Sequence, residues 1–369
     1  MDIRDIEKAW RVLWMRAIAR ALPGARTAVL PTNTARPLRV LFVRYERIGD
    51  MIMSTGMIRV LAQSPVAMQL DVLANPTTLP VLENNPHVRR VFTLDRKSWK
   101  SYHEVGAQLR AEKYDVIVDG RINNPPVFTS TPLLMLRAAA PYRVGVGGGN
   151  NDLVYNIAVK PYDRVTHYID GSRGLAEPFG VAVDKADWRP EIFLTDLEKS
   201  RANDVWYRAS ARLGQSRLEP SDEPRLLVNL SASEPKRRWT DDNFIHVLRA
   251  VRDAHASMPI VVIGLPAEWD SVQRVAASVN AEPAATSRLR DALALVGTSD
   301  RVFTPDTSIS HAASAFSKPE VVLLKREHHP YAPWNDAARI VFWDGETIAG
   351  LAPEVVTEAV LDLTGGRRS

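Results

Sequence analysis

Short apolar runs alternate with amphipathic stretches along the first half of the chain. Apolar residues at helical spacing fall between these runs, as in Thr55–Ala62 and Ser101–Glu112. This alternation predicts a mainly parallel sheet covered by helices. The predicted strands are Leu38–Val43, Leu70–Leu73, Val88–Phe92, Val116–Val118 and the short Arg143–Val144.

The second half repeats this alternation around a polar stretch with two prolines at residues 214–224. We therefore predict two α/β domains, residues 38–195 and 196–345, followed by a C-terminal helix and tail at 346–369. The predicted strands are Leu226–Leu230, Pro259–Ile263, Arg301–Phe303 and Glu320–Leu324, and the predicted helices are Asp196–Leu213, Asp241–Asp253, Glu268–Ala277, Leu289–Val296, Ser308–Phe316 and Ala352–Leu363.

An amphipathic helix is predicted for residues 1–24, ahead of a connector at residues 25–37. A basic helix with two Trp residues can lie on an anionic membrane. The apolar stripe can equally dock on the body of this protein or on a second subunit, since surface helices usually bury their apolar face in protein. The stripe comprises Ile3, Ile6, Trp10, Leu13, Trp14, Ala17 and Ala21, and Pro23-Gly24 ends the helix.

Composition and charge narrow the classes of function. The 369 residues are 45% hydrophobic, enough for two cores, and contain no Cys, which excludes disulfides, thiolate nucleophiles and zinc–thiolate sites. The longest apolar stretches are strand-sized and charges interrupt the N-terminal one, so we predict neither a membrane span nor a signal peptide. We expect a cytoplasmic protein. The net charge of +4 is too diffuse to indicate nucleic acid binding.

An acidic residue follows the first predicted strand closely. In open α/β sheets ligands bind at the carboxyl ends of strands, and Asp50 comes just after Leu38–Val43. A turn at Gly49 can aim its carboxylate into a cleft between two domains, where it can act as a general base. Alternatively, Asp50 is the N-cap of the next helix, a common role for Asp in such a turn.

A basic segment, Lys236-Arg237-Arg238, lies between the first strand and the first helix of the second domain. Cations and helix N-terminal N–H groups stabilise the charge that develops on a departing diphosphate. The hydroxyls of Ser231 and Ser233 can donate hydrogen bonds to the same oxygens. The alternative is a solvated basic loop.

A second anion site is predicted where Arg301–Phe303 leads into a helix, with Asp306, Thr307 and Ser308 at the junction. His311 either contacts phosphate or the donor sugar or packs as a buried helix histidine. The chain lacks an Asp-x-Asp motif, the usual sign of a metal-bridged nucleotide sugar. Together with the absence of metal-ligand spacing, this predicts no metal and no cofactor.

These motifs together resemble glycosyltransferase family 9, the ADP-heptose:lipopolysaccharide heptosyltransferases. The resemblance implies a GT-B fold, with two facing Rossmann-like domains and mainly parallel sheets, and a closing C-terminal helix that folds back across the first domain. The matching segments occur in the family's order across residues 38–335 and are Val40–Asp50, Thr55–Leu61, Leu82–Pro86, Tyr114–Asp119, Lys236–Trp239 and Asp306–His311.

The resemblance also implies roles for single residues. Asp50 matches the family's catalytic base and Lys236 its phosphate-binding lysine. Asp306 matches the aspartate that contacts the donor sugar, in a loop that holds phosphate. Glu268 matches the acidic ribose ligand, with a surface residue at the start of a helix as the alternative.

The chain departs from the family pattern beside these residues. Tyr45, Glu46 and Arg47 stand where many members carry small hydroxyl residues, which leaves the acceptor open. Arg44 occupies a position that is usually basic in the family, and Arg44 and Arg47 are the candidate acceptor-binding residues. Ser308 replaces the usual Gly, so the backbone approaches the donor less closely.

Two further loops have weaker signals. The segment at residues 145–150 fails G-x-G-x-x-G because position 150 is Asn, and we predict a flexible loop near the cleft. The aromatic loop at residues 328–334, which begins with His328-His329, can flank the adenine or gate the cleft. Adjacent histidines lack metal-helix spacing.

The resemblance implies an inverting, metal-independent glycosyltransferase that moves a heptose from ADP-heptose to a lipopolysaccharide-core or related cell-envelope glycan. Its place would be the cytoplasmic face of the inner membrane, where peripheral association stays open. The alternatives are another nucleotide sugar, a protein or capsule acceptor, a sugar-nucleotide epimerase with the same two-domain plan, and a catalytically inactive binding subunit.

Overall fold

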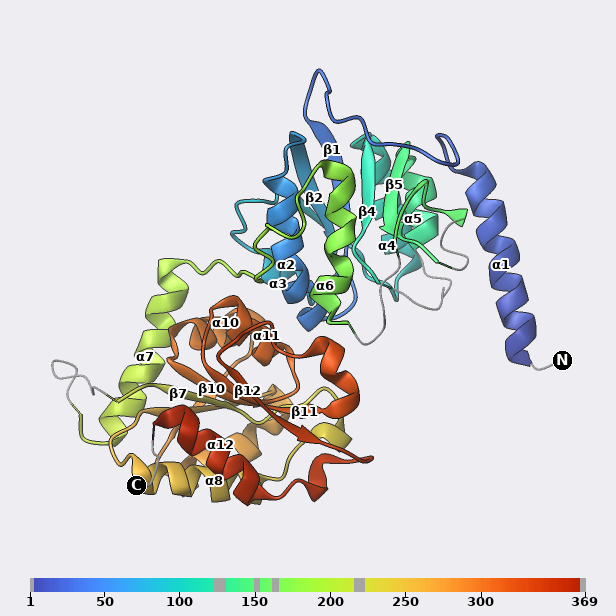
Figure 1. The fold of residues 1–369 in the computed structure, drawn as a ribbon. Coiled ribbons are helices and arrows are strands. Elements are labelled where there is room, and N and C mark those ends of the chain that lie inside the picture. Colours follow the sequence, from blue (N-terminus) through green and yellow to red (C-terminus); the bar gives the residue numbers. More distant parts are fainter. Residues whose placement is uncertain (1–2, 123–130, 149–152, 161–165, 216–222, 366–369) are drawn as a thin grey trace. The chain divides into compact units, whose positions relative to one another are not determined.

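The computed structural model describes residues 3–122, 131–148, 153–160, 166–215 and 223–365. They form two compact units, Met1–Trp188 and Arg189–Ser369. Each unit has a six-stranded sheet with helices packed around it (Figure 1).

The first unit has the strand order β3-β2-β1-β4-β5-β6, and its strands pair in parallel. This order, with the first strand near the centre, is typical of Rossmann folds. Val43 at the end of β1 lies opposite Asp119 at the end of β4, so the two strand ends are neighbours. The strands are β1 Leu38–Val43, β2 Met68–Ala74, β3 Arg90–Thr93, β4 Val116–Asp119, β5 Tyr142–Val146 and β6 Ile157–Val159.

The second unit repeats the same topology as β12-β11-β10-β7-β8-β9, again with parallel pairs. Strand β7 lies between β10 and β8, so the loops that follow these three strands emerge side by side. The strands are β7 Leu226–Asn229, β8 Ile260–Gly264, β9 Glu282–Ala285, β10 Arg301–Pro305, β11 Glu320–Lys325 and β12 Ala338–Trp343.

Helices flank both sheets, and most pairs of successive strands are joined through one, as parallel pairing favours. In the first unit they are α1 Ile3–Ala21, α2 Ile48–Ala62, α3 Leu79–Leu82, α4 Trp99–Ala111, α5 Thr131–Ala138, α6 Tyr168–Ser172 and the 3₁₀ helix η2 Arg173–Phe179. In the second they are α7 Asp196–Arg212, α8 Asp241–Ala254, α9 Trp269–Ser278, α10 Leu289–Thr298, α11 Ser308–Ala315 and α12 Pro353–Thr364, with short 3₁₀ turns η3 Pro235–Arg237, η4 Pro266–Glu268, η5 Arg326–Tyr331 and η6 Ile348–Gly350.

Several elements were not predicted. Strands β6, β9 and β12 lie at or next to sheet edges or carry weak apolar patterns, so local sequence marks them poorly. Helix α2 begins at Ile48, seven residues ahead of the predicted start at Thr55. Nearly every residue from Met51 to Leu61 is buried, so the first turns of this helix show no alternation of polar and apolar faces that would mark its start.

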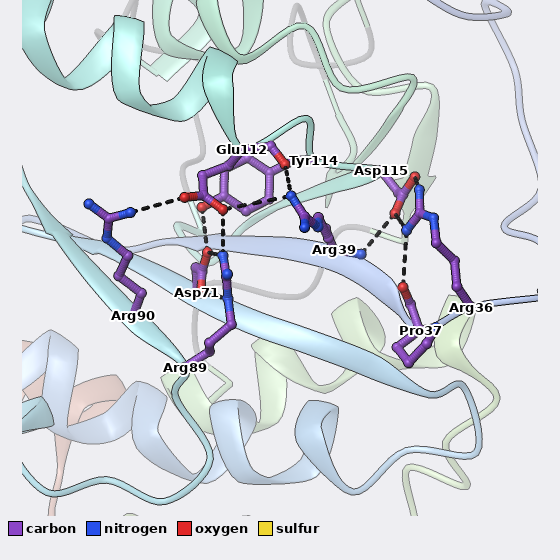
Figure 2. A network of polar contacts seen from close by, with 9 residues as sticks. All are labelled: Arg36, Pro37, Arg39, Asp71, Arg89, Arg90, Glu112, Tyr114 and Asp115. Carbon is purple, nitrogen blue, oxygen red and sulfur yellow. Dashed lines mark hydrogen bonds and ion pairs between the residues drawn. The ribbon is translucent and has the colours of Figure 1, made fainter.

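A polar network lies at the amino ends of β1, β3 and β4 in the first sheet (Figure 2). Asp71, which is fully buried, accepts hydrogen bonds from Arg89 and from the Tyr114 hydroxyl. Asp115 accepts from both terminal nitrogens of Arg36 at 2.8 Å. Tyr114 and Asp115, which helped to carry the family resemblance, therefore stabilise the scaffold.

Trp239 holds the loop between β7 and α8 to the core of the second unit. Its ring is fully buried, meets Phe244 edge-on at 5.3 Å, and its Nε1 donates to the carbonyl of Leu351 at 3.2 Å. Helix α12 packs on α8, and its buried residues belong to the same core. This is the helix expected to fold back across the first domain; its apolar face packs within the second unit.

Candidate functional site

Asp50 lies in the first turn of α2, just beyond the carboxyl end of β1. The N-cap of this helix is Arg47, which makes no side-chain cap hydrogen bond. The alternative that Asp50 is the N-cap is therefore wrong, because the helix begins two residues before it. A carboxylate in the first turn is stabilised by the helix dipole.

The Arg44 guanidinium lies between two carboxylates. Its Nη2 is 3.3 Å from Asp50 Oδ1, and its Nη1 is 3.7 Å from Glu46 Oε2. The Arg44 side chain is only 5% exposed, whereas those of Asp50 and Glu46 are 17% and 23% exposed. Burial raises the pKa of Glu46, although Arg44 and Arg121 oppose the shift. Arg47, by contrast, is exposed.

A second arginine reaches this cluster from the end of β4. Arg121 Nε and Nη2 donate to the two oxygens of Asp119 at 2.8 and 2.7 Å, and Arg121 Nε is 3.4 Å from Glu46 Oε1. The Tyr155 hydroxyl donates to Asp119 at 2.6 Å. Burial alone would raise the pKa of Asp119, but Arg121 and Tyr155 lower it. Asp119 therefore remains ionised and fixes Arg121.

Gly120, between these two residues, completes the support of Arg44. Its carbonyl accepts hydrogen bonds from Arg44 Nη1 at 3.3 Å and from the Tyr168 hydroxyl at 2.6 Å. A Cβ at this position would lie 2.3 Å from Phe42 Cζ, so only glycine fits. Arg121 and Tyr168 were not among the predicted site residues. The signal for Arg121 was its place two residues after the buried strand, next to an acid.

In the second unit, Asn229 joins the ends of β7 and β10. Its amide nitrogen donates to Thr304 Oγ1 at 2.9 Å and to Thr307 Oγ1 at 3.2 Å. Thr307 is the N-cap of α11, and its hydroxyl accepts from the Ile309 N–H. The Thr307 hydroxyl therefore orients the loop, and Ser308 follows as the first residue of α11.

Ser231 and Glu268, both predicted, lie together. Ser231 Oγ donates to Glu268 Oε2 at 2.6 Å and accepts from the Leu265 N–H at 2.7 Å. Arg238 Nε lies 3.3 Å from Glu268 Oε1. Glu268 ends the turn η4 ahead of α9, so it is the acid at the end of β8.

Asp306 is held by Arg237 of the predicted basic segment and by His328 of the predicted aromatic loop. His328 Nδ1 lies 3.0 Å from Asp306 Oδ2, and Arg237 Nη1 lies 3.5 Å from the same oxygen. Arg237 Nη2 is 3.3 Å from His328 Nε2. The loop after β11 thus contributes a histidine to the end of β10. The sequence signal for His328 was the His328-His329 pair at the start of an aromatic loop.

The remaining predicted residues differ in exposure. Lys236 is 56% exposed, with its Nζ 3.3 Å from Glu234 Oε2. Ser233 is exposed, and its hydroxyl lies 3.4 Å from Arg237 Nη1. His311 is buried within α11. The described part of the chain holds no cluster of three or more His, Cys, Asp or Glu that could bind a metal ion.

The loop after β7 thus places Arg237 beside Asp306, two residues ahead of the start of α11, and Lys236 and Arg238 flank Arg237 in the chain. Cations close to a helix N-terminus are typical of an anion site. Of the segment predicted as a flexible loop, residues 145 and 146 belong to β5, and residues 149 and 150 lie outside the described residues.

Within the described ranges, no helix combines the length and apolarity that a membrane span needs.

The sequence is similar to known glycosyltransferases along most of its length. The sequence model of glycosyltransferase family 9 (heptosyltransferase) matches residues 102–351. Lipopolysaccharide heptosyltransferase 3 of Escherichia coli K12 is 20% identical over 313 residues, covering 80% of this chain and 85% of that protein. The lipopolysaccharide core heptosyltransferase OpsX of Haemophilus influenzae is 20% identical over 322 residues, covering 85% and 86%.

Solved structures share the fold. The family 9 glycosyltransferase of Veillonella parvula aligns with a TM-score of 0.75 at 17% identity, covering 92% of this chain and 99% of that one. The E. coli heptosyltransferase WaaC with ADP aligns with a TM-score of 0.70 at 16% identity, covering 88% and 100%. These similarities and the two parallel sheets confirm the predicted α/β fold class of GT-B type.

Proposed function

This chain belongs to glycosyltransferase family 9 and is a glycosyltransferase, and we propose that it transfers a heptose from ADP-heptose to a lipopolysaccharide-core or related cell-envelope glycan. The observation that carries the proposal is that each unit has its own polar cluster at equivalent strand ends. In the first unit an acid supported by arginines follows β1, and in the second a basic loop after β7 meets an acid after β10.

The second unit is the proposed donor site. Lys236 and Arg237 would neutralise the diphosphate, and the N–H groups at the start of α11 would bind the same oxygens. Asp306 would contact the donor sugar, and Glu268 would accept hydrogen bonds from the ribose hydroxyls. A heptosyl donor is supported by the similarity to the lipopolysaccharide heptosyltransferases of Escherichia coli and Haemophilus influenzae. Ser231, Ser233, Thr307, Ser308 and His311 complete the proposed donor set.

The first unit is the proposed acceptor site, with Asp50 as general base. The Asp50 carboxylate would accept the proton of the acceptor hydroxyl while that oxygen bonds to the anomeric carbon. The bond from this carbon to the diphosphate breaks at the same time, and ADP leaves with the electron pair. Attack opposite the leaving group inverts the anomeric centre. Arg44, which is buried beside Asp50, would orient the base, and the exposed Arg47 would contact the acceptor.

The proposed acceptor is a glycan or glycolipid at the cytoplasmic face of the inner membrane, and the enzyme would associate with that membrane peripherally. The acceptor class is supported by the two relatives named for lipopolysaccharide synthesis. Tyr45, Glu46 and Arg47 stand beside the proposed base, where many members of the family carry small hydroxyl residues, so the proposal leaves the exact acceptor open.

A thermal-shift panel of nucleoside diphosphates and their sugars tests the donor assignment. A ligand that binds only the native state raises the melting temperature. We expect ADP and ADP-heptose to raise it, and UDP and GDP to raise it less. A larger rise in melting temperature with another nucleotide sugar would assign that sugar as the donor instead. Release of free nucleotide without any acceptor would favour an epimerase.

A further inference from the structure

Among the residues of α1 whose side chains the structure describes, one apolar face packs on the first unit and another is exposed. Met15, Ile18 and Leu22 are buried in the core of the first unit, where α1 contacts α5. The large apolar residues of the other face, Trp10 and Leu13, are 61% and 58% exposed.

The exposed face corresponds to the predicted stripe from Trp10 to Ala21, the part of it whose side chains the structure describes. Trp14 in this stripe is 57% exposed, and Ala17 and Ala21 are exposed as well. The buried residues are offset from it around the helix, since they follow their own spacing of three and four. Docking on the protein body therefore uses a different face, and it leaves the Trp stripe uncovered. Figure 1 shows α1 lying along the outside of the first unit beside α5.

Positive charge borders this stripe. Arg16 and Arg20 are exposed and lie three residues after Leu13 and Ala17, which places them along one edge of the stripe. The sequence of α1 contains five basic and two acidic residues. A helix with Trp on one face and Arg beside it has the composition of helices that lie in the headgroup region of anionic bilayers.

We propose that the face of α1 formed by Trp10, Leu13 and Trp14 docks on an anionic lipid surface, with Arg16 and Arg20 contacting lipid phosphates. The buried face keeps α1 attached to α5 while the other face inserts. This inference rests on the proposed function, because an acceptor held in a membrane gives the docking its purpose.

A second copy of the chain is a less suitable occupant. Three partly exposed side chains supply about 400 Å² of apolar surface, from roughly 150–250 Å² for each large side chain, and stable dimers bury about 800 Å² per partner. Exposed arginines at the edge of the stripe would also repel their symmetry copies, whereas lipid phosphates attract them.

Vesicle sedimentation of the full chain tests the proposal. The vesicles contain phosphatidylglycerol and phosphatidylethanolamine, with pure phosphatidylcholine as the neutral comparison. The test variant is Trp10→Ser/Leu13→Ser/Trp14→Ser. The matched control is Trp99→Ser/Leu197→Ser, because these residues are 78% and 60% exposed on α4 and α7. A third variant, Arg16→Gln/Arg20→Gln, tests the charge.

We expect the wild type and the control to bind anionic vesicles, and the triple variant to bind at least about tenfold more weakly. The Arg variant should bind more weakly at low salt and respond less to added salt. Equal binding by the triple variant and the wild type overturns the proposal. Loss of an oligomer in that variant, without any wild-type binding to vesicles, also overturns it and assigns the face to a second copy.

The response of the melting temperature to ADP is measured on the same proteins. These exposed substitutions should leave it unchanged. Vesicle binding without a response to ADP would refute the proposed donor and leave the docking face supported. A response to ADP without vesicle binding would refute the docking face and leave the donor supported.

Discussion

Arg44 Nη2 lies 3.3 Å from Asp50 Oδ1, at the point where β1 gives way to α2. The guanidinium is nearly buried, and the Gly120 carbonyl holds its other terminal nitrogen at 3.3 Å. The carboxylate is the more exposed partner of the pair. A fixed arginine therefore orients an acid that solvent or substrate can reach, and this is the geometry that a positioned base requires.

Asp50→Asn should abolish most transfer and leave donor binding near the wild-type level. The amide keeps the size of the side chain but cannot accept the acceptor's proton, so we expect a fall of ~10² or more in kcat. Because the N-cap is Arg47, the variant should lose little stability. Transfer rates and ADP affinity measured together check this, and a fully active variant would refute the catalytic assignment.

Glu46→Gln should slow transfer about tenfold. The Glu46 carboxylate lies 3.7 Å from Arg44 and 3.4 Å from Arg121, and Arg44 lies 3.3 Å from Asp50. Without the Glu46 charge, Arg44 is held less firmly beside the proposed base, so the rate should fall while ADP binding stays near the wild-type level. Glu46→Asp keeps the charge and should restore part of the rate. An unchanged rate in Glu46→Gln would show that Glu46 does not support Arg44 in transfer.

Lys236→Ala should weaken ADP binding and slow transfer together, by on the order of 10²–10³ in rate, because a cation on the leaving group is lost. Lys199→Ala is the matched control. Lys199 is 50% exposed and 3.2 Å from Asp196, much as Lys236 is 56% exposed and 3.3 Å from Glu234. If the two variants have the same ADP affinity and transfer rate, Lys236 is a residue of a solvated basic loop and not a phosphate ligand.

Glu320→Gln should stabilise the protein in mildly alkaline solution. Burial raises the pKa of Glu320 to about 8, and among the described residues its oxygens have no hydrogen-bond partner of ordinary geometry, although Ser310, Asn335 and Ser314 lower the pKa in part. The folded carboxyl therefore keeps its proton where the unfolded one has lost it. Stability falls as pH rises from about 4.5 to about 8, by ~1.4 kcal/mol per unit, and then levels off.

The neutral amide of Gln removes this dependence. Denaturant unfolding at pH 5 and pH 8 measures it: the variant should match the wild type at pH 5 and exceed it by up to ~4 kcal/mol at pH 8. Parallel pH profiles for the two proteins would show that Glu320 does not titrate between these values.

The sequence by itself determined the two α/β units and the positions of their acidic and basic strand ends. Apolar runs such as Leu38–Val43 and Leu226–Leu230 are local, and in a parallel sheet every such run delivers the next polar residue to the same edge. Asp50, Lys236 and Asp306 could be found in this way because each follows its own strand.

Only the tertiary structure decided which side chains meet. Arg121 reaches Glu46 from another strand, and His328 reaches Asp306 from the loop after β11. It also decided that Met15 and Ile18 pack while the Trp stripe of α1 stays exposed. Side-chain partners and buried faces depend on strand order and packing, which bring together residues that a local pattern cannot relate.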